Sequence, residues 1–533
     1  MNAPKAESEG ASNLKELRKR IARDKRRLVF HSDGKHMEKE KMALETEECL
    51  FRFLPGHPVD TLTYSLMHQF NVARLYRSEV AQEWPAGHIA KVFGDGPDGL
   101  ELYIDFCREN GYEAFWAMRM NDTHDGPDTE HGRMRWNSTH WKHDHPEFLV
   151  GTREKQPPHA RWSALDYRFE AVREQVLLIL EEVCRNYDVD GIKLDFFRHP
   201  TCFGSSAWGG EATAEEREMM TDLFRRIREM TESVGLERGR PILVAARTPD
   251  STAYASALGL DVEEWMRRDL IDIWIGGGYF VLREWEESVE IAHRHGCQFW
   301  AGLDESRASG IGNGGHNSPE AWRGRVHTAW SAGVDGVFLF NFMYRPETPT
   351  FKALSDLWSL EGLAGKDKMY VVSPTYEYAQ SEIWLKNGGR HFSRKSGFSP
   401  KSRAELEGGA SRTVELRIDD DLQAAPVSVR LGLHLDGAEQ TSHVELTFNN
   451  VRMSEAVLSD ESGEEADFCN HEGAALAMPC PGRWLLSDIP PGLVKAGSNS
   501  IGISADGRVR LTLNDLRVWV RYGDGAPEGN GTA

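Results

Sequence analysis

The run "DGIKLDFFRHP", from Asp190 to Pro200, places Lys193 and Asp195 inside an apolar stretch. Burying an unpaired charge is costly, so such residues need a partner or a chemical role. Side chains two residues apart share one face of a strand, so the Lys193 ammonium can pair with the Asp195 carboxylate and keep it ionised. An ionised, fixed carboxylate can attack or stabilise an oxocarbenium centre, as cleavage of a glycosidic bond requires. The alternative is a structural ion pair inside a barrel.

Eight short apolar runs recur through the first two thirds of the chain. They cover residues 28–34, 59–66, 112–122, 191–197, 241–247, 271–277, 297–306 and 335–342. Runs of this length that are apolar throughout are typical of strands covered on both faces, as in a parallel sheet.

Helical patterns lie between several of these runs, at residues 163–187, 213–235, 282–296 and 318–333. Apolar residues there recur at three- and four-residue spacing, and the pattern at 213–235 ends on a glycine, which is a helix stop signal. Eight strands alternating with helices predict a (β/α)8 TIM barrel. A doubly wound open sheet is the alternative, but the first run is not followed by a glycine-rich phosphate loop.

The pattern changes after about residue 370. Runs such as "RTVELRIDD" and "HVELTFNNVRM" alternate apolar and polar residues, as half-exposed antiparallel strands do. The fold class is therefore α/β, a TIM barrel followed by a C-terminal antiparallel β-sandwich. We expect a charged lead-in over residues 1–25, solvated and partly helical, and the barrel over 26–368. The sandwich follows over 369–524, carbohydrate-binding-like or structural, packed on the barrel, and a disordered tail covers 525–533.

Polar groups stand at the C-terminal ends of the predicted barrel strands, where such barrels carry their active sites. Every strand except the second supplies one. Besides Asp195, the candidates for substrate binding are His31, Asp33, Arg119, Asn121, Asp122, His124, Lys193, Arg198, Arg247, Trp274, Arg307 and Asn341.

Glycoside hydrolysis needs a second carboxylate. Asp304 and Glu305 end the seventh strand, which lies nearly opposite the fourth in an eight-stranded barrel. Adjacent strand residues face opposite ways, so only one should point inward. We favour Glu305 over Asp304, with Asp33 and Asp122 in reserve.

The segment after the third strand is rich in histidine and tryptophan, including His124, His131, Trp136, His140 and His145. A metal site is one interpretation, but the segment lacks the HExxH spacing of zinc enzymes. We favour a hydrogen-bonding and stacking wall for sugar, and we expect no metal and no cofactor.

The net charge of the chain limits the kinds of molecule that it could bind, and its cysteines indicate the redox state of its compartment. The chain has 63 basic and 83 acidic residues, a net charge of −20, which argues against nucleic acid or an anionic membrane as a partner. The seven cysteines are scattered and form no CxxC pair, which favours reduced thiols. The N-terminus has no apolar stretch after its charges, so it does not predict a signal peptide. We expect a cytoplasmic protein that could form a homo-oligomer.

The run "GIKLDFFRHP" resembles the G-I-x-L-D-x-x-R-x-P signature of glycoside hydrolase family 10-like barrel proteins of environmental bacteria. This resemblance covers roughly residues 26 to 350 and implies a barrel acting on carbohydrate, with Asp195, Arg198 and Arg119–Asp122 in its mouth. The triplet "KLD" also resembles the nucleophile strand of α-galactosidases, in which an aspartate from a later strand is the acid. True family-10 xylanases differ, because a glutamate follows their fourth strand. The run "IPPGLVKAGSNSIGI" resembles an edge of galactose-binding-like sandwiches.

These features predict a glycoside hydrolase that acts on oligo- or polysaccharide with a pair of carboxylates. Four arginines near the mouth, Arg119, Arg198, Arg247 and Arg307, favour an anionic glycan, a uronate or a sulfated sugar. Alternatively, these arginines pair with the carboxylates of the mouth itself. A polysaccharide lyase or sugar isomerase on the same barrel and a non-catalytic carbohydrate-binding protein are the other hypotheses.

Overall fold

The protein was analysed as a computed structural model. The structure describes residues 3–24, 26–33, 50–67, 70–73, 75–83, 87–124, 140–197, 199–304, 317–342, 344–372, 381–395, 404–407, 409–420, 422, 427–441, 444–460, 482–507 and 509–523.

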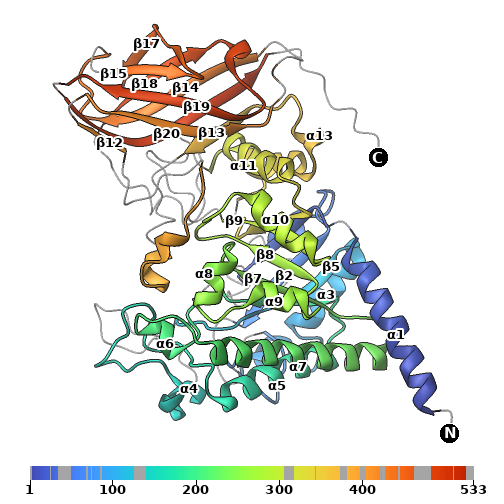
Figure 1. The fold of residues 1–533 in the computed structure, drawn as a ribbon. Coiled ribbons are helices and arrows are strands. Elements are labelled where there is room, and N and C mark those ends of the chain that lie inside the picture. Colours follow the sequence, from blue (N-terminus) through green and yellow to red (C-terminus); the bar gives the residue numbers. More distant parts are fainter. Residues whose placement is uncertain are drawn as a thin grey trace. The chain divides into compact units, whose positions relative to one another are not determined.

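Eight parallel strands form a closed barrel, as the sequence predicts (Figure 1). They are β1 (Leu28–Ser32), β2 (Thr61–Met67), β5 (Glu113–Arg119), β6 (Gly191–Asp195), β7 (Leu243–Thr248), β8 (Ile273–Gly276), β9 (Gln298–Asp304) and β10 (Gly336–Phe340). Each predicted apolar run contains most or all of one strand.

Helices alternate with these strands. They are α2 (His88–Phe93), α3 (Gly99–Asn110), α4 (His140–Asp144), α5 (Glu170–Asn186), α6 (Gly204–Ala207), α7 (Ala214–Arg238), α8 (Thr252–Ala257), α9 (Val262–Arg267), α10 (Trp285–Arg294) and α11 (Pro319–Ser331). Two short strands, β3 (Val72–Ala73) and β4 (Gln82–Glu83), pair with each other outside the barrel.

Helix α5 begins seven residues later than its pattern predicts, at Glu170 rather than Ser163. The backbone N–H groups before it are bonded elsewhere: Leu165 donates to the Asn121 side chain, and Tyr167 donates to the Cys202 carbonyl. These tertiary hydrogen bonds replace the first turns of the helix.

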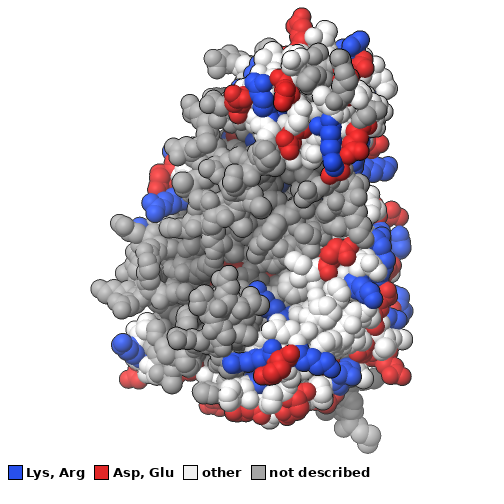
Figure 2. Space-filling view, turned by 90° about the vertical axis from the view of Figure 1, so that its left-hand side faces the viewer, with Lys and Arg blue, Asp and Glu red and all other residues white. Residues whose placement is uncertain are grey.

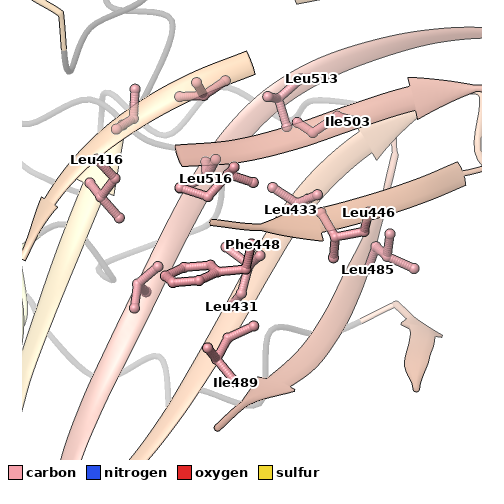
Figure 3. Close-up of a cluster of buried hydrophobic side chains, with 14 of the residues drawn as sticks. Leu416, Leu431, Leu433, Leu446, Phe448, Leu485, Ile489, Ile503, Leu513 and Leu516 are labelled. Atoms are coloured by element: carbon pink, nitrogen blue, oxygen red, sulfur yellow. The ribbon is translucent and has the colours of Figure 1, made fainter. Parts of the chain in front are cut away.

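The C-terminal strands form two antiparallel sheets. One sheet has the order β11 (Lys368–Val372), β20 (Arg510–Tyr522), β14 (Val427–Asp436), β18 (Arg483–Ile489) and β17 (Ala456–Ser459), and β12 (Ala404–Glu407) also pairs with β20. The other has the order β13 (Ser411–Ile418), β19 (Gly497–Ala505), β15 (Val444–Phe448) and β16 (Val451–Arg452). Alternate residues of both sheets form a buried core that includes Leu416, Leu431, Leu446, Phe448 and Ile503 (Figure 3). This is the expected β-sandwich.

By its internal contacts, the chain divides into two compact units. The first contains residues 1–303, 334–342 and 380–391, and the second contains residues 304–333, 343–379 and 392–533. Helix α11, which connects β9 to β10 along the chain, is therefore part of the sandwich's unit. So is the connecting segment with α12 (Pro349–Lys352), a 3-10 helix (Ala353–Trp358) and α13 (Leu360–Leu363). Our domain limits, the tail and the docking of the sandwich on the barrel stay predictions.

The surface mixes both signs of charge. Figure 2 shows lysine and arginine beside aspartate and glutamate on the described part of one face. Ion pairs between exposed residues include those of Arg225 with Asp222 and Glu229 on α7. The described cysteines, Cys107, Cys184, Cys202 and Cys297, are buried and free, as expected of reduced thiols.

The N-terminal segment forms helix α1 (Ala3–Ala22), which differs in one respect from a solvated lead-in. Arg18 is only 2% exposed, and its guanidinium donates to Asp272 at 2.5 Å and to Asp269 at 2.7 Å. Asp272 also accepts from Arg228 of α7 at 2.7 Å and from the Val244 N–H of β7 at 2.8 Å. This buried carboxylate therefore holds two helices to one barrel strand.

Replacing Asp272 with alanine should lower the free energy of unfolding of the barrel by about 3–5 kcal/mol, because it removes a partner of two buried guanidinium groups. Urea unfolding followed by circular dichroism measures this. Asp222→Ala is the control: this carboxylate is 44% exposed and pairs with the exposed Arg225, so its loss should change little. Equal effects of the two changes would contradict this role of Asp272.

Candidate active site

The charged residues of the neighbouring strands β5, β6 and β7 lie at matching heights in the barrel. In the sheet register Arg119 of β5, Asp195 of β6 and Arg247 of β7 stand side by side. Two residues earlier, Lys193 stands between Ala117 and Ala245. The small alanine side chains leave room for the long lysine side chain inside the barrel.

Gly191, two residues before Lys193 on the same face of β6, leaves space for an aromatic ring. Gly191 stands beside Phe115 of β5, and a Cβ atom at Gly191 would lie 2.5 Å from the Phe115 ring. The phenyl ring therefore occupies the space below Lys193. The alternation of "GIKLD" in the sequence thus corresponds to one inward face with Gly191, Lys193 and Asp195.

The Asp195 carboxylate is buried and held from three directions. Its Oδ2 accepts from Lys193 Nζ at 3.0 Å and from Arg247 Nη1 at 3.2 Å, and its Oδ1 accepts from the Phe197 N–H at 3.0 Å. Burial alone would raise the pKa of Asp195, but the charges on Lys193 and Arg247 lower it well below its ordinary value. Asp195 is therefore a carboxylate that stays ionised at neutral pH.

Lys193 connects Asp195 to His31 of β1. Its Nζ lies 3.3 Å from His31 Nδ1, and burial lowers the pKa of Lys193 to about 8. Burial also lowers the pKa of His31 to about 4, assisted by the positive charge of Lys193. His31 Nε2 lies 3.2 Å from Asp33 Oδ1, and Nδ1 lies 2.6 Å from the Thr63 hydroxyl and 3.1 Å from the Thr63 carbonyl oxygen.

A second group of ion pairs continues from Asp33. Arg119 Nη2 lies 2.9 Å from Asp33 Oδ1, and Arg119 Nη1 donates to Asp122 Oδ2 at 2.7 Å. Asn341, which follows β10 with a left-handed φ of 51°, donates to Asp33 Oδ2 at 3.0 Å. One continuous polar network thus runs from Asp195 through Lys193 and His31 to Asp33, and from there through Arg119 to Asp122.

The network ends at the trio Asp122, His124 and His199, whose ligand atoms lie within 4.8 Å of one another. His124 Nδ1 lies 2.5 Å from Asp122 Oδ1, and His199 Nδ1 accepts from the Thr123 N–H at 3.1 Å. Burial opposes ionisation of Asp122, but His124 and Arg119 lower its pKa well below its ordinary value. A metal ion here would compete with these hydrogen bonds and with the Arg119 charge, so the trio fits an ion-pair network better than a metal centre.

Aromatic rings enclose the Arg247 guanidinium. Its Cζ lies 4.1 Å from the Phe340 ring centre and within 5.7 Å of the ring centres of Phe197, Tyr279 and Phe338. Nε and Nη2 of this fully buried side chain have no hydrogen-bond partner among the described residues. Arg247 holds Asp195 through Nη1, and its Nη2 lies beside Gly278, where an added Cβ atom would be 2.2 Å away.

Two predicted binding residues have other contacts. Asn121 donates to the Thr201 carbonyl at 2.6 Å and accepts from the Leu165 N–H at 2.9 Å, so its amide holds loop backbone. Trp274 stands in register with Ala246, not with Arg247, so its indole is on the strand face opposite to the Arg247 side chain. Its Nε1 donates to the Thr248 hydroxyl at 2.8 Å.

The carboxylates that follow β9 are only partly described. Asp304 is the last residue of β9 and is buried, with 6% of its surface exposed. Alternation along the strand puts Asp304 on the same face as Trp300, the residue in register with Ile275 and, through β8, with Arg247. Glu305, Arg198 and Arg307 lie outside the described residues, as do His131 and Trp136.

The sequence prediction missed several members of the network. The second strand does supply a polar group, because Thr63 of β2 bonds His31. Phe338 and Phe340 of β10 stack on the His31 ring at 5.3 and 5.1 Å. The inward alternation of Thr61, Thr63 and Ser65 was the signal that could have revealed Thr63.

No protein-family model and no curated protein sequence matches the chain. Similar solved structures include α-L-fucosidase isoenzyme 2 from Paenibacillus thiaminolyticus, with 14% identity over 63% of this chain and 49% of that chain and a TM-score of 0.42. A family-36 α-galactosidase from Geobacillus stearothermophilus has 12% identity over 90% of this chain and 58% of its own, with a TM-score of 0.37. The PgaB glycoside hydrolase domain from Bordetella bronchiseptica has 10% identity over 63% of this chain and 99% of its own, with a TM-score of 0.41.

The chain spans about half to three fifths of the length of the first two structures. All three are glycoside hydrolases by name, and none supports family 10 in particular. At these identities and scores the similarity identifies no family for this chain. Within the described residues, none of the helices combines the length and the apolar character needed to span a membrane.

Proposed function

We propose that the protein is a glycoside hydrolase in which Asp195 is the reacting carboxylate. The observation that carries the proposal is the environment of Asp195: a buried side chain, kept ionised by Lys193 and Arg247, at the C-terminal end of β6. Active sites of such barrels lie at that end of the strands. A carboxylate with a single bonded N–H on Oδ1 among the described residues keeps a lone pair there for the reaction.

A separation of about 5–5.5 Å between the two carboxylates would give a reaction in two displacements, and a wider one would give inversion. In the first case, Asp195 Oδ1 attacks the anomeric carbon while a carboxylic acid protonates the departing glycosidic oxygen, and the glycosidic bond breaks. Water, deprotonated by the same acid/base group, then displaces Asp195 and restores both residues. Lys193 and Arg247 stabilise the carboxylate as it leaves in the second step, since both donate to Oδ2.

We assign the acid/base role to the chain at the end of β9, where Asp304 and Glu305 follow each other. The strand alternation now favours Asp304 over Glu305, because Asp304 shares the face of Trp300. Asp33 and Asp122 are weaker candidates, since Arg119 contacts both and disfavours the protonated form that an acid needs.

A lyase or isomerase and a sugar-binding protein are the competing functions. A lyase would give unsaturated products, which a hydrolase does not, and a binding protein would give no product. Incubation with a panel of oligosaccharides, with reducing ends and ultraviolet absorbance of unsaturated uronates measured together, separates the three. New reducing ends without ultraviolet absorbance are the result expected of a hydrolase.

Asp195→Asn should fold normally and lose activity by a factor of at least about 10² to 10⁴, because the amide keeps the shape and removes the nucleophile. Initial rates on the best substrate of the panel measure the loss. Asp222→Asn, on the exposed face of α7, is the matched control and should keep full activity. Retention of more than about a tenth of the activity by Asp195→Asn would overturn the assignment.

The substrate should carry an anionic group, a uronate or a sulfate. Arg119 contacts Asp33 and Asp122, so its charge is compensated within the network, and the proposal rests on the N–H groups of Arg247 instead. One charged hydrogen bond is worth about tenfold in kcat/KM. We therefore expect the charged form of one oligosaccharide to be cleaved about tenfold more efficiently than its neutral form in paired assays. Equal kcat/KM for the two forms would exclude this preference.

A further inference from the structure

Basic side chains without an acidic partner gather on one surface of the barrel's unit. Every described arginine and lysine between residues 162 and 303 has a nitrogen within 3.8 Å of a carboxylate oxygen. Arg153, Lys155, Arg161 and Lys386 are exposed, and within the described part of the chain none of them forms an ion pair. Because the whole chain has a net charge of −20, this local excess of positive charge needs an explanation.

An exposed tryptophan lies between two of these basic side chains. Nζ of Lys155 lies 5.0 Å from the centre of the Trp208 ring, and a Cβ atom added to the neighbouring Gly209 would lie 3.5 Å from Lys386 Cδ. The Trp208 side chain is 41% exposed, although its Nε1 donates to the Val150 carbonyl at 2.8 Å. This hydrogen bond fixes the indole ring while part of the ring remains open to solvent.

Three segments of the barrel's unit carry these residues. They are the loop 148–166 after β5, residues 199–212 after β6, and the segment 380–391. His159 of the first segment donates from its N–H to the Ala207 carbonyl at 3.1 Å, and its Nδ1 lies 3.1 Å from the Glu382 carbonyl oxygen. These contacts hold the three segments together, and all three belong to one compact unit.

Arg161 extends this surface to the mouth of the barrel. Its Nη1 donates to the Thr123 carbonyl at 3.3 Å, and the Thr123 N–H donates to His199 Nδ1 at 3.1 Å. Thr123 directly follows Asp122, the carboxylate at the far end of the polar network that begins at Asp195. A sugar chain whose reacting unit lies at Asp195 can therefore continue past Arg161 over the exposed surface.

The carboxylates of these three segments are largely compensated. Asp166 pairs with Arg168, Glu211 pairs with Arg390, and Glu382 accepts from the Gly389 N–H at 3.0 Å, whereas Glu154 stands between Arg153 and Lys155 in the sequence. Four basic groups thus stand against one uncompensated carboxylate among the described residues. Guanidinium and ammonium groups bind carboxylate and sulfate oxygens, and the exposed indole offers a flat apolar surface for a sugar ring.

We infer that Arg153, Lys155, Arg161, Trp208 and Lys386 form a binding surface, the Trp208 surface, for an anionic sugar chain outside the mouth. Its basic groups bind the carboxylates or sulfates of the chain, and the indole packs against a sugar ring. The inference rests on the proposed function in one respect, since the bound chain is the substrate that Asp195 cleaves. The Trp208 surface contributes affinity for long substrates and takes no part in bond cleavage.

The double variant Lys155→Glu/Lys386→Glu tests the inference in the full-length protein. Electrophoresis through gels containing polygalacturonate or dextran sulfate measures the affinity, with Asp195→Asn added to prevent cleavage during the run. The affinity for both polyanions should fall about tenfold, because two exposed charge pairs are replaced by repulsion. Gels with neutral dextran should show a much smaller change.

Arg20→Glu/Lys91→Glu is the matched control. Both residues are exposed, on α1 and α2, and within the described residues neither forms an ion pair. The control changes the net charge by the same amount as the test variant, so it should keep the wild-type affinity if the effect is local. An equal fall in the two double variants would show a general charge effect and overturn the inference.

Trp208→Ala is the second variant and tests the indole. It should weaken binding of polygalacturonate about fivefold, the value of roughly 40 Å² of buried apolar surface, and Trp208→Phe should restore most of the affinity. Wild-type affinity in both Trp208→Ala and the Lys155→Glu/Lys386→Glu variant, or a wild-type protein that neither polyanion retards, would overturn the inference.

Kinetics with Asp195 intact separate this inference from the proposed function. For Lys155→Glu/Lys386→Glu, KM should rise about tenfold for a long anionic oligosaccharide and less for a short one. About 1 M salt should remove the difference, because the Debye length then falls to about 3 Å. An unchanged KM for the long substrate would overturn this inference alone, whereas full activity of Asp195→Asn would overturn the proposed function and leave the result of the binding gels standing.

Discussion

The ion pair between Lys193 and Asp195 is the interaction on which the interior of the barrel depends. Both side chains are buried, and removing charges from water costs several kcal/mol per ion unless partners compensate. The surrounding residues supply this compensation: Arg247 and the Phe197 N–H complete the shell of Asp195. Ala117 and Ala245 beside Lys193 leave room for its side chain, and Gly191 leaves room for the Phe115 ring.

Arg247 keeps Nε and Nη2 without a partner among the described residues, as Arg228 does with Nε and Nη1 in the structural cluster around Asp272. His31 stays neutral between Lys193 and Asp33 and so connects two charged groups without adding a charge. The three basic residues Arg119, Lys193 and Arg247 pair with the three acidic residues Asp33, Asp122 and Asp195, which offsets the cost of burying these charges.

Much of the fold could be predicted from the sequence, because period-two and period-3.6 patterns report which faces are buried. The apolar runs located all eight barrel strands, and the alternating runs located the sandwich. At the site, the i, i+2 spacing of Lys193 and Asp195 was sufficient to predict their pairing. It could not assign the inward face of β8, where Trp274 stands in register with Ala246 and Ile275 with Arg247. Thr63 was missed because threonine in an apolar run is also an ordinary strand residue.

Helix α11 shows a limit of a different kind. Its apolar pattern is compatible with any sheet that needs covering, and only long-range packing decides that Ala321 meets Trp484 and Trp519. The close approach of Gly324 to Met369, whose carbonyl oxygen would lie 2.1 Å from an added Cβ atom, is likewise invisible in one sequence, where an isolated helix glycine has several explanations. The sequence named Asp304 and Glu305 and favoured Glu305, because it could not show that Asp304 shares the strand face of Trp300.

The pH dependence of kcat/KM in Lys193→Met tests most directly whether an ionised Asp195, held by its neighbours, is the reacting group. The isosteric apolar side chain removes one of the two charges that lower the pKa of Asp195, while Arg247 remains. Because the nucleophile must be ionised, the acid limb of the profile should move to higher pH, with the basic limb in place. An acid limb at the wild-type position would contradict the account, since Asp195 would then not be the group whose ionisation the reaction requires.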